Sequence, residues 1–167
     1  NLVKAFNLFL EKYQLDIDLV VAGKTDMHYP EIKQDALNIK HRSQVIFTGY
    51  ISDLDLAFLY LGAYAFVSAS LDEGFGLPGV EAMTFGLPLI VSNLPVFNEI
   101  YDNAGIYFDP LNIEDIAEKM HLIASDKGFY KQMQIKSLNR GLLFDWTKTA
   151  KETLAVYYEA APQTYAN

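Results

Sequence analysis

Two glutamates, Glu73 and Glu81, have seven residues between them, and this segment, residues 74–80, reads Gly-Phe-Gly-Leu-Pro-Gly-Val. Glycines lack the Cβ that would hold a ligand away from the backbone. We therefore expect three backbone amides to be free to point at an anion, those of Phe75, Gly76 and Leu77. Pro78 favours the first turn of a helix, whose N-terminus carries a positive partial charge. The segment predicts a loop that binds a phosphate or diphosphate.

The two glutamates are suited to binding hydroxyl groups. A carboxylate can accept two hydrogen bonds from a vicinal diol. Glu81, about one turn into the predicted helix, is placed for a ribose, and Glu73, ahead of the turn, for other hydroxyls. The alternative is that both are solvated carboxylates near a helix end, and that the glycines, Gly74, Gly76 and Gly79, serve only a tight strand-to-helix turn.

The glycine spacing also fits the dinucleotide pattern G-x-G-x-x-G, which is a weak signal by itself. That fingerprint expects an acidic residue at the end of the following strand. Here the strand ends at Ser92, and the nearest acid, Glu99, falls in the next helix, where we expect a surface position. A dinucleotide-dependent oxidoreductase domain and a noncatalytic α/β interaction module remain the alternatives.

Short apolar strands alternate with helices along the chain, which predicts parallel βαβ units. Residues 19–23, a β-branched run ended by glycine, predict a strand buried on both faces. Asn1 is expected to cap the first helix. The predicted strands cover residues 19–23, 45–49, 65–68, 87–92 and 106–108. The predicted helices cover residues 2–13, 30–39, 53–61, 78–85, 96–101, 112–124 and 128–138, with one more from residue 146.

These elements predict an α/β fold, a Rossmann-like doubly wound parallel sheet flanked by helices. Ligands of such sheets bind beyond the carboxyl ends of the strands, which points to the loops after Gly23, Gly49, Ser68 and Ser92. A sheet of this kind normally starts with a strand, whereas this chain starts with a helix. We therefore expect a fragment of a longer protein, without its first strand and the loop after it.

Composition excludes several classes of function. The 167 residues are 51% hydrophobic and 20% charged, which indicates one globular domain with one core. No cysteine is present, so thiol catalysis and thiolate metal sites are ruled out. The net charge of −8, without a basic stripe, argues against a nucleic-acid partner. Apolar runs fall short of the ~20 residues that span a bilayer, and we expect a cytoplasmic protein.

Histidines and serines do not indicate a metal site or a hydrolase. The three histidines, His28, His41 and His121, are scattered, and we expect exposed side chains and no metal. No G-x-S-x-G elbow surrounds any of the three serines near predicted strand ends, Ser68, Ser70 and Ser92. Most of the 11 Tyr and 11 Phe should lie in the core, with a few exposed where a partner domain docks.

At this point the sequence resembles a known family, the retaining glycosyltransferases of group 1 (family four), in the C-terminal, donor-binding half of their two-domain GT-B fold. The resemblance runs from Leu19 to about Met120, and Trp146 to Tyr157 is similar to the family's closing helix. The matching pieces are Val21-Ala22-Gly23, Phe47-Thr48-Gly49-Tyr50, Ser68-Ala69-Ser70, Glu73 to Glu81, Gly86-Leu87-Pro88, Ala104-Gly105 and Phe108-Asp109-Pro110.

The resemblance implies roles for individual residues. Glu73, the candidate catalytic residue, would bind hydroxyls of the transferred hexose, and Glu81 would bind the ribose. The segment Gly74, Phe75, Gly76 and Leu77 would bind the sugar and diphosphate. The loop of Gly49, Tyr50 and Ile51 would lie near the base. Residues 1–167 would then be one nucleotide-sugar-binding domain, with no cofactor other than the donor substrate.

The resemblance also implies what the sequence lacks. The family's Arg and Lys that neutralise the diphosphate precede Asn1, and the hydroxyl acceptor, a glycan or lipid-linked sugar, would bind through an N-terminal half. We expect these 167 residues alone to bind nucleotide weakly and to transfer nothing. Peripheral membrane association of the full-length enzyme is left open.

Overall fold

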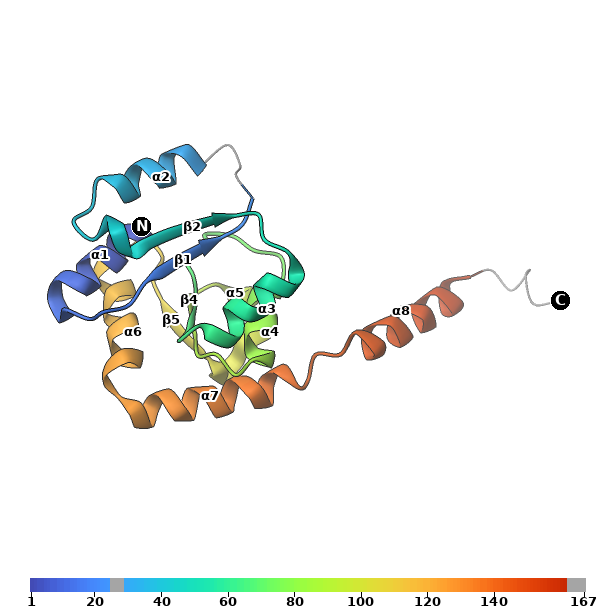
Figure 1. Ribbon diagram of the computed structural model, residues 1–167. Coiled ribbons are helices and arrows are strands. Elements are labelled where there is room, and N and C mark those ends of the chain that lie inside the picture. Colours follow the sequence, from blue (N-terminus) through green and yellow to red (C-terminus); the bar gives the residue numbers. More distant parts are fainter. Residues whose placement is uncertain (25–28, 162–167) are drawn as a thin grey trace.

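The computed structural model describes residues 1–24 and 29–161 (Figure 1). Its strands are β1 (Leu19–Ala22), β2 (Val45–Gly49), β3 (Phe66–Ser68), β4 (Leu89–Ser92) and β5 (Gly105–Phe108). Its α-helices are α1 (Leu2–Tyr13), α2 (Tyr29–Leu37), α3 (Asp53–Gly62), α4 (Leu77–Thr84), α5 (Pro95–Tyr101), α6 (Ile113–Ser125), α7 (Lys127–Gly141) and α8 (Trp146–Ala160). Short 3-10 turns, Arg42–Gln44 and Asp102–Ala104, precede β2 and β5. The alternation of strands and helices is confirmed.

All strand pairs are parallel, as predicted, but they form two separate ladders. β1 pairs with β2, and β3, β4 and β5 form a three-stranded sheet with β4 in the centre. Parallel neighbours need crossover connections, and helices supply them here. The α/β fold class is thereby confirmed.

The central strand β4 is buried on both faces, and its side chains divide the core. Ile90 packs in a cluster with residues of α1 and α6. Its neighbours Leu89 and Val91 point the other way, into a second cluster with residues of α4 and α5. Successive strand residues face opposite sides, so helices cover both faces, as in a doubly wound sheet. The single core that composition indicated is thus two clusters separated by the sheet.

β1 corrects the prediction for residues 19–23. Leu19 and Val21 pack against the first cluster, but Val20 is 42% exposed and Ala22 is also exposed. The strand is therefore buried on one face only. The composition of β1 is typical of a strand covered on both faces. Its burial, however, depends on which elements pack against the second face, and the residue pattern does not specify them.

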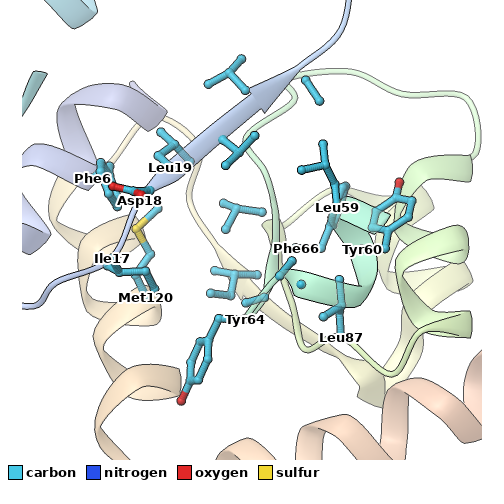
Figure 2. A pocket seen from close by; sticks show the side chains of 18 of the residues that line it. Phe6, Ile17, Asp18, Leu19, Leu59, Tyr60, Tyr64, Phe66, Leu87 and Met120 are labelled. Carbon is cyan, nitrogen blue, oxygen red and sulfur yellow. The ribbon is translucent and has the colours of Figure 1, made fainter. Parts of the chain in front are cut away.

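An apolar cavity of about 610 Å³ lies between β1 and β3. Figure 2 shows Leu19 and Phe66 on its two strand walls, with Leu59 of α3 and Met120 of α6 beside them. In the part of the chain that the structure describes, β1 pairs only with β2, and β3 only with β4. Each strand therefore leaves one edge of backbone N–H and C=O groups without a ladder partner.

Side-chain caps fix the starts of most of the longer helices. Ser52, Asn112, Asp126 and Asp145 accept hydrogen bonds from backbone amides in the first turns of α3, α6, α7 and α8. Asn1 is the N-cap residue of α1, as expected, but its side chain makes no capping hydrogen bond. Its side-chain amide instead donates to the carbonyl of Pro110, 2.9 Å away, so it ties the helix start to the loop after β5.

The last helix, α8, projects away from the other elements (Figure 1), and none of its residues is buried. Trp146 and Leu154 on this helix are exposed, and so are Tyr157 and Tyr158, which are among the few Tyr and Phe residues expected outside the core. None of the helices in residues 1–24 and 29–161 has the length and apolar character needed to cross a membrane.

Candidate functional site

The glycine segment forms the loop between β3 and α4, at the carboxyl end of β3. Gly76 caps α4 with a φ of 90°, in the left-handed region that glycine tolerates best. Leu77 and Pro78 open the helix, one residue earlier than predicted. Within the described chain, no backbone hydrogen bond from the amide of Phe75, Gly76 or Leu77 is present. These three N–H groups at a helix N-terminus are therefore available to an anion.

Two of the three glycines are required by packing from inside the protein. A Cβ added at Gly76 or Gly79 would collide with the hydroxyl of Tyr101, and one at Gly76 would lie 2.7 Å from the ring of Phe97. The Tyr101 hydroxyl also donates to the carbonyl of Gly76 at 2.7 Å. Around Gly74, by contrast, a Cβ would meet no atom within 4 Å. Only Gly74 leaves open space that a ligand could use.

Tyr101 of α5 is the buried support of this loop, and sequence reasoning did not identify it. Burial, together with the charge of Glu73, raises the pKa of Tyr101, so its hydroxyl stays protonated and continues to donate. The signal in the sequence was weak, because an apolar helix ending in Tyr looks like any core helix. The contact depends on how α5 packs beneath the loop.

Serines at the ends of β3 and β4 hold Glu73. The hydroxyl of Ser70 donates to Oε1 of Glu73 at 2.9 Å and lies 3.1 Å from the hydroxyl of Ser68. The buried Ser92 hydroxyl donates to the carbonyl of Ser68 at 3.3 Å. Glu73 itself is exposed. The serines thus orient the Glu73 carboxylate at the carboxyl end of β3. From the sequence alone, these serines were considered only as nucleophiles.

Glu81 lies on α4 with an exposed side chain, and one of its oxygens is already bonded. The hydroxyl of Tyr60 on α3 lies 3.2 Å from Oε2 of Glu81 and 3.2 Å from the carbonyl of Pro78. Tyr60 is only 8% exposed, and its ring stacks on Phe85. A buried phenol therefore donates toward the carboxylate that the sequence assigns to a ribose.

The aromatic side chain of the loop, Phe75, contacts the segment between α7 and α8. Its ring meets the ring of Phe144 edge-on, with centroids 6.0 Å apart. Arg140 lies over Phe144 and donates to the carbonyls of Ile100 and Glu99. Glu99 is exposed on α5, as predicted. Phe144 thereby links the glycine loop to Arg140 at the C-terminal end of α7, although the two segments are far apart in the sequence.

The loop of Gly49, Tyr50 and Ile51 lies at the carboxyl end of β2. Gly49 has a φ of 67°, and its carbonyl accepts a hydrogen bond from Gly23 at the end of β1. Tyr50 is 70% exposed, and the ammonium of Lys24 lies 5.3 Å from its ring centroid. This loop reaches Glu81 indirectly, because α3 begins beside it and carries Tyr60. Lys24 adds a cation to this edge that the sequence reading overlooked.

Two histidines differ from expectation. His41 is half-buried and hydrogen-bonds through Nδ1 to Gln44, and His121 is half-buried and stacks on Tyr13 with ring centroids 3.5 Å apart. Both were expected to be exposed; both pack against α1 instead. His28 lies outside the described residues. In those that are described, no group of three or more acidic or histidine side chains could hold a metal ion.

The site therefore combines free amides at the N-terminus of α4 with two hydrogen-bonded glutamates, one in the loop after β3 and one on α4. Amides of this kind bind anions, and exposed carboxylates bind hydroxyls. The apolar cavity between β1 and β3 is a different feature. Of the residues described above for this site, only Tyr60 lines it.

Comparisons with known proteins identify relatives of this chain and of its fold. The chain is 34% identical over 154 residues to the "Serotype-specific mannosyltransferase WbdA" of Escherichia coli, matching 89% of this chain and 18% of that protein. The chain thus spans about a fifth of the length of this relative.

Solved structures share the fold. Sucrose-phosphate synthase from Thermosynechococcus elongatus superposes with a TM-score of 0.83 at 22% identity, over 94% of this chain and 41% of that chain. The C-terminal domain of the group 1 glycosyl transferase LpcC from Francisella tularensis gives a TM-score of 0.72 at 27% identity, over 83% of this chain and 74% of that one.

The sequence model of one family, "Glycosyl transferases group 1", matches residues 1–140. Those residues contain both glutamates, the glycine loop and all strands of both ladders that the structure describes. The chain belongs to the group 1 glycosyl transferases.

Proposed function

We propose that this chain is the donor-binding domain of a retaining hexosyltransferase, which moves a hexosyl group from a nucleoside diphosphate sugar to a hydroxyl acceptor. The observation that carries the proposal is the β3–α4 loop, where unpaired amides of Phe75, Gly76 and Leu77 lie between Glu73 and Glu81. Only a ligand with both an anionic group and several hydroxyls uses all of these groups. A sugar attached to a diphosphate is such a ligand.

Each group has a role in this proposal. The amides and the N-terminus of α4 bind the diphosphate and stabilise the negative charge that develops on it as the sugar departs. Glu73, fixed by Ser70, binds hexose hydroxyls beside the reacting carbon. Glu81 binds the ribose, and Gly49, Tyr50 and Ile51 line the base. The net charge of −8 does not oppose this, because the helix N-terminus acts locally.

The E. coli relative is a mannosyltransferase, which favours a mannosyl group as the hexose. For the acceptor we propose a glycan or a lipid-linked sugar. We propose that the acceptor binds through a domain outside these 167 residues, on which this chain depends for transfer. The chain alone is then expected to bind donor weakly and to transfer nothing. Sugar transfer by the isolated chain would contradict this point.

We also propose that the cavity between β1 and β3 receives one further parallel strand, from a part of the longer polypeptide that precedes α1. In the described part of the chain both facing strand edges are unpaired, and most residues that line the cavity are apolar. A strand followed by α1 and β1 would repeat the crossover seen elsewhere in the fold. Hydrogen exchange tests this. In a longer polypeptide the amides of β1 and β3 should exchange more slowly than in the present chain, with β4 amides as the control.

The donor test is a titration with UDP-, GDP- and ADP-sugars, and with NADH, followed by NMR. Glu73→Gln and Glu81→Gln should each lower affinity for the preferred nucleotide sugar about tenfold, because each loses the charge on a hydrogen-bond acceptor. Glu99→Gln removes the same charge from an exposed position on α5 and is the matched control. Tighter binding of NADH than of any nucleotide sugar would favour the oxidoreductase alternative. Equal affinities of all three variants would favour the noncatalytic alternative.

A further inference from the structure

Glu81 occupies an exposed position on α4, where a glutamate side chain would ordinarily sample many rotamers. A ligand that needs this carboxylate in one orientation would have to bear that loss of freedom on binding. In this structure one neighbour restricts it beforehand. The hydroxyl of Tyr60, carried on a different helix, lies 3.2 Å from Oε2 of Glu81.

We propose that Tyr60 is a positioning residue that holds Glu81 in the orientation needed to bind the ribose hydroxyls of the donor, and that it thereby sets the preference for ribonucleotides. This inference rests on the proposed function of Glu81. It adds a residue that does not touch the ligand itself. With Tyr60 donating to Oε2, the other oxygen, Oε1, remains for the diol.

The surroundings of Tyr60 suit this role. The side chain is 8% exposed, and its ring is fixed by stacking on Phe85 at a centroid distance of 5.3 Å. Its hydroxyl also lies 3.2 Å from the carbonyl of Pro78, so both of its contacts are on α4, one in the first turn and one in the second. Burial and the charge of Glu81 raise the pKa of Tyr60, which keeps the hydroxyl a donor at any physiological pH.

The position of Tyr60 on α3 gives the contact a second consequence. α3 begins at Asp53, directly after Tyr50 and Ile51, the residues proposed to line the base. The bond from Tyr60 to Glu81 therefore connects the base side of the site with the ribose side through one rigid helix. A buried donor on α3 fixes the distance between these two parts better than an exposed loop contact could.

The test compares Tyr60→Phe with the unaltered chain. The variant removes one oxygen and keeps the ring that stacks on Phe85. Affinities are measured by NMR titration with UDP, GDP and ADP, and then with the 2′,3′-dideoxy form of whichever nucleotide binds most tightly. Tyr60→Phe should weaken ribonucleotide binding about fivefold, because the lost charge-assisted hydrogen bond affects the ligand only through Glu81. Binding of the dideoxynucleotide should be unchanged.

Two further variants sharpen the result. Tyr64→Phe is the matched control, because the Tyr64 hydroxyl donates to the carbonyl of Ile123, away from Glu81. This variant should leave the ratio of the ribonucleotide and dideoxynucleotide affinities unchanged. In a Glu81→Ala background, Tyr60→Phe should have no additional effect on ribonucleotide binding, since the two residues act as one unit.

The outcomes separate the inference from the proposed function. If Glu81→Ala loses ribonucleotide preference while Tyr60→Phe retains it, the role of Tyr60 is wrong and the proposed function stands. If Tyr60→Phe weakens both nucleotides equally, its effect is on the fold and the inference is again overturned. If Glu81→Ala leaves the preference unchanged, or no nucleotide binds at all, the proposed function fails and takes the inference with it.

Discussion

Strands β1 and β4 have nearly the same sequence character but opposite environments. β1 is Leu-Val-Val-Ala and β4 is Leu-Ile-Val-Ser, each four residues long. Every residue of β4 is buried between two paired neighbours, whereas β1 has one neighbour, an open cavity on its other edge and alternating half-buried and exposed side chains. The difference teaches that an apolar β-branched run predicts a strand, while the elements around it decide whether that strand is core. Four predictions test how far this contrast extends.

The largest change in stability should come from substitutions of two glycines, one at or after the end of a strand in each ladder. Gly76 follows β3 and Gly49 ends β2, and both have a φ in the left-handed region, 90° and 67°. Gly49→Ala meets no atom within 4 Å and should cost only backbone strain, about 1–2 kcal/mol. Gly76→Ala adds a collision with Tyr101 and should lower the free energy of unfolding by about 4 kcal/mol. Urea unfolding measures both, and equal losses would contradict the buried support that Tyr101 gives the loop.

Hydrogen exchange should show a direct difference in amide protection between β4 and β1. The amides of β4 should be protected at least about a hundredfold more than those of β1, because β4 exposes its amides only when the larger sheet opens. β1 can separate from its single neighbour without disturbing β4. Similar protection in both strands would mean that they open as one unit, and the contrast drawn above would then not apply to stability.

Two valines, one buried and one exposed, test how much side-chain packing contributes to stability in each strand. Val91 in β4 is fully buried, and Val20 in β1 is 42% exposed. Val91→Ala should lower the free energy of unfolding by about 2 kcal/mol, since two buried methyl groups are lost, and Val20→Ala by less than about 1 kcal/mol. Thermal or urea unfolding of the two variants gives the comparison, with the same change in strand propensity in each. A larger loss at Val20 would show that β1 is more deeply packed than its exposure indicates.

The smallest expected effect is a loss of stability at alkaline pH in the three-stranded ladder, which contains β5. Burial raises the pKa of Tyr107, on β5, from 10.0 to about 12. Because the folded state binds the proton more tightly, stability should be complete below pH 10 and fall as the pH rises toward 12, by at most about 2 kcal/mol from this half-buried group.

The control for this titration is Tyr107→Phe. Loss of the hydroxyl bonds to the carbonyls of Phe97 and Asp102 should lower stability at neutral pH and flatten the alkaline decline. Urea midpoints measured at pH 9 and pH 11 show both changes. An unchanged alkaline slope in the variant would assign the decline to other groups.

Much of the fold could be predicted because its signals are local. Asn112 and Asp126 precede their helices as caps, and each predicted strand appears within a few residues of its expected bounds. Asn1 also stands at the N-cap position of α1, but its side chain makes no capping bond, and its amide nitrogen donates to the carbonyl of Pro110 across the fold. The position of a cap can thus be predicted locally, whereas the partner of its side chain depends on the fold.

Part of the candidate site could likewise be predicted from the sequence, and part could not. The segment from Glu73 to Glu81 was recognisable because glycines, a proline and two acids are contiguous, and the roles assigned to them stay predictions. The reason for Gly76 and Gly79 was not recognisable. Their missing side chains make room for Tyr101, a residue more than 20 positions away that only chain folding brings beneath the loop. The same holds for Tyr60, which lies 21 positions from Glu81, whereas Ser70 fixes Glu73 from only 3 positions away.

The amino-acid sequence by itself determined the strand and helix order, the parallel α/β class and the place of the glycine loop, because these follow from periodicity and short-range turn chemistry. Tertiary structure alone decided that β1 is half exposed, that two clusters form the core, and that Tyr101 and Tyr60 support the loop and Glu81. Burial and hydrogen-bond partners belong to pairs of distant residues, and a linear pattern specifies only one member of each pair.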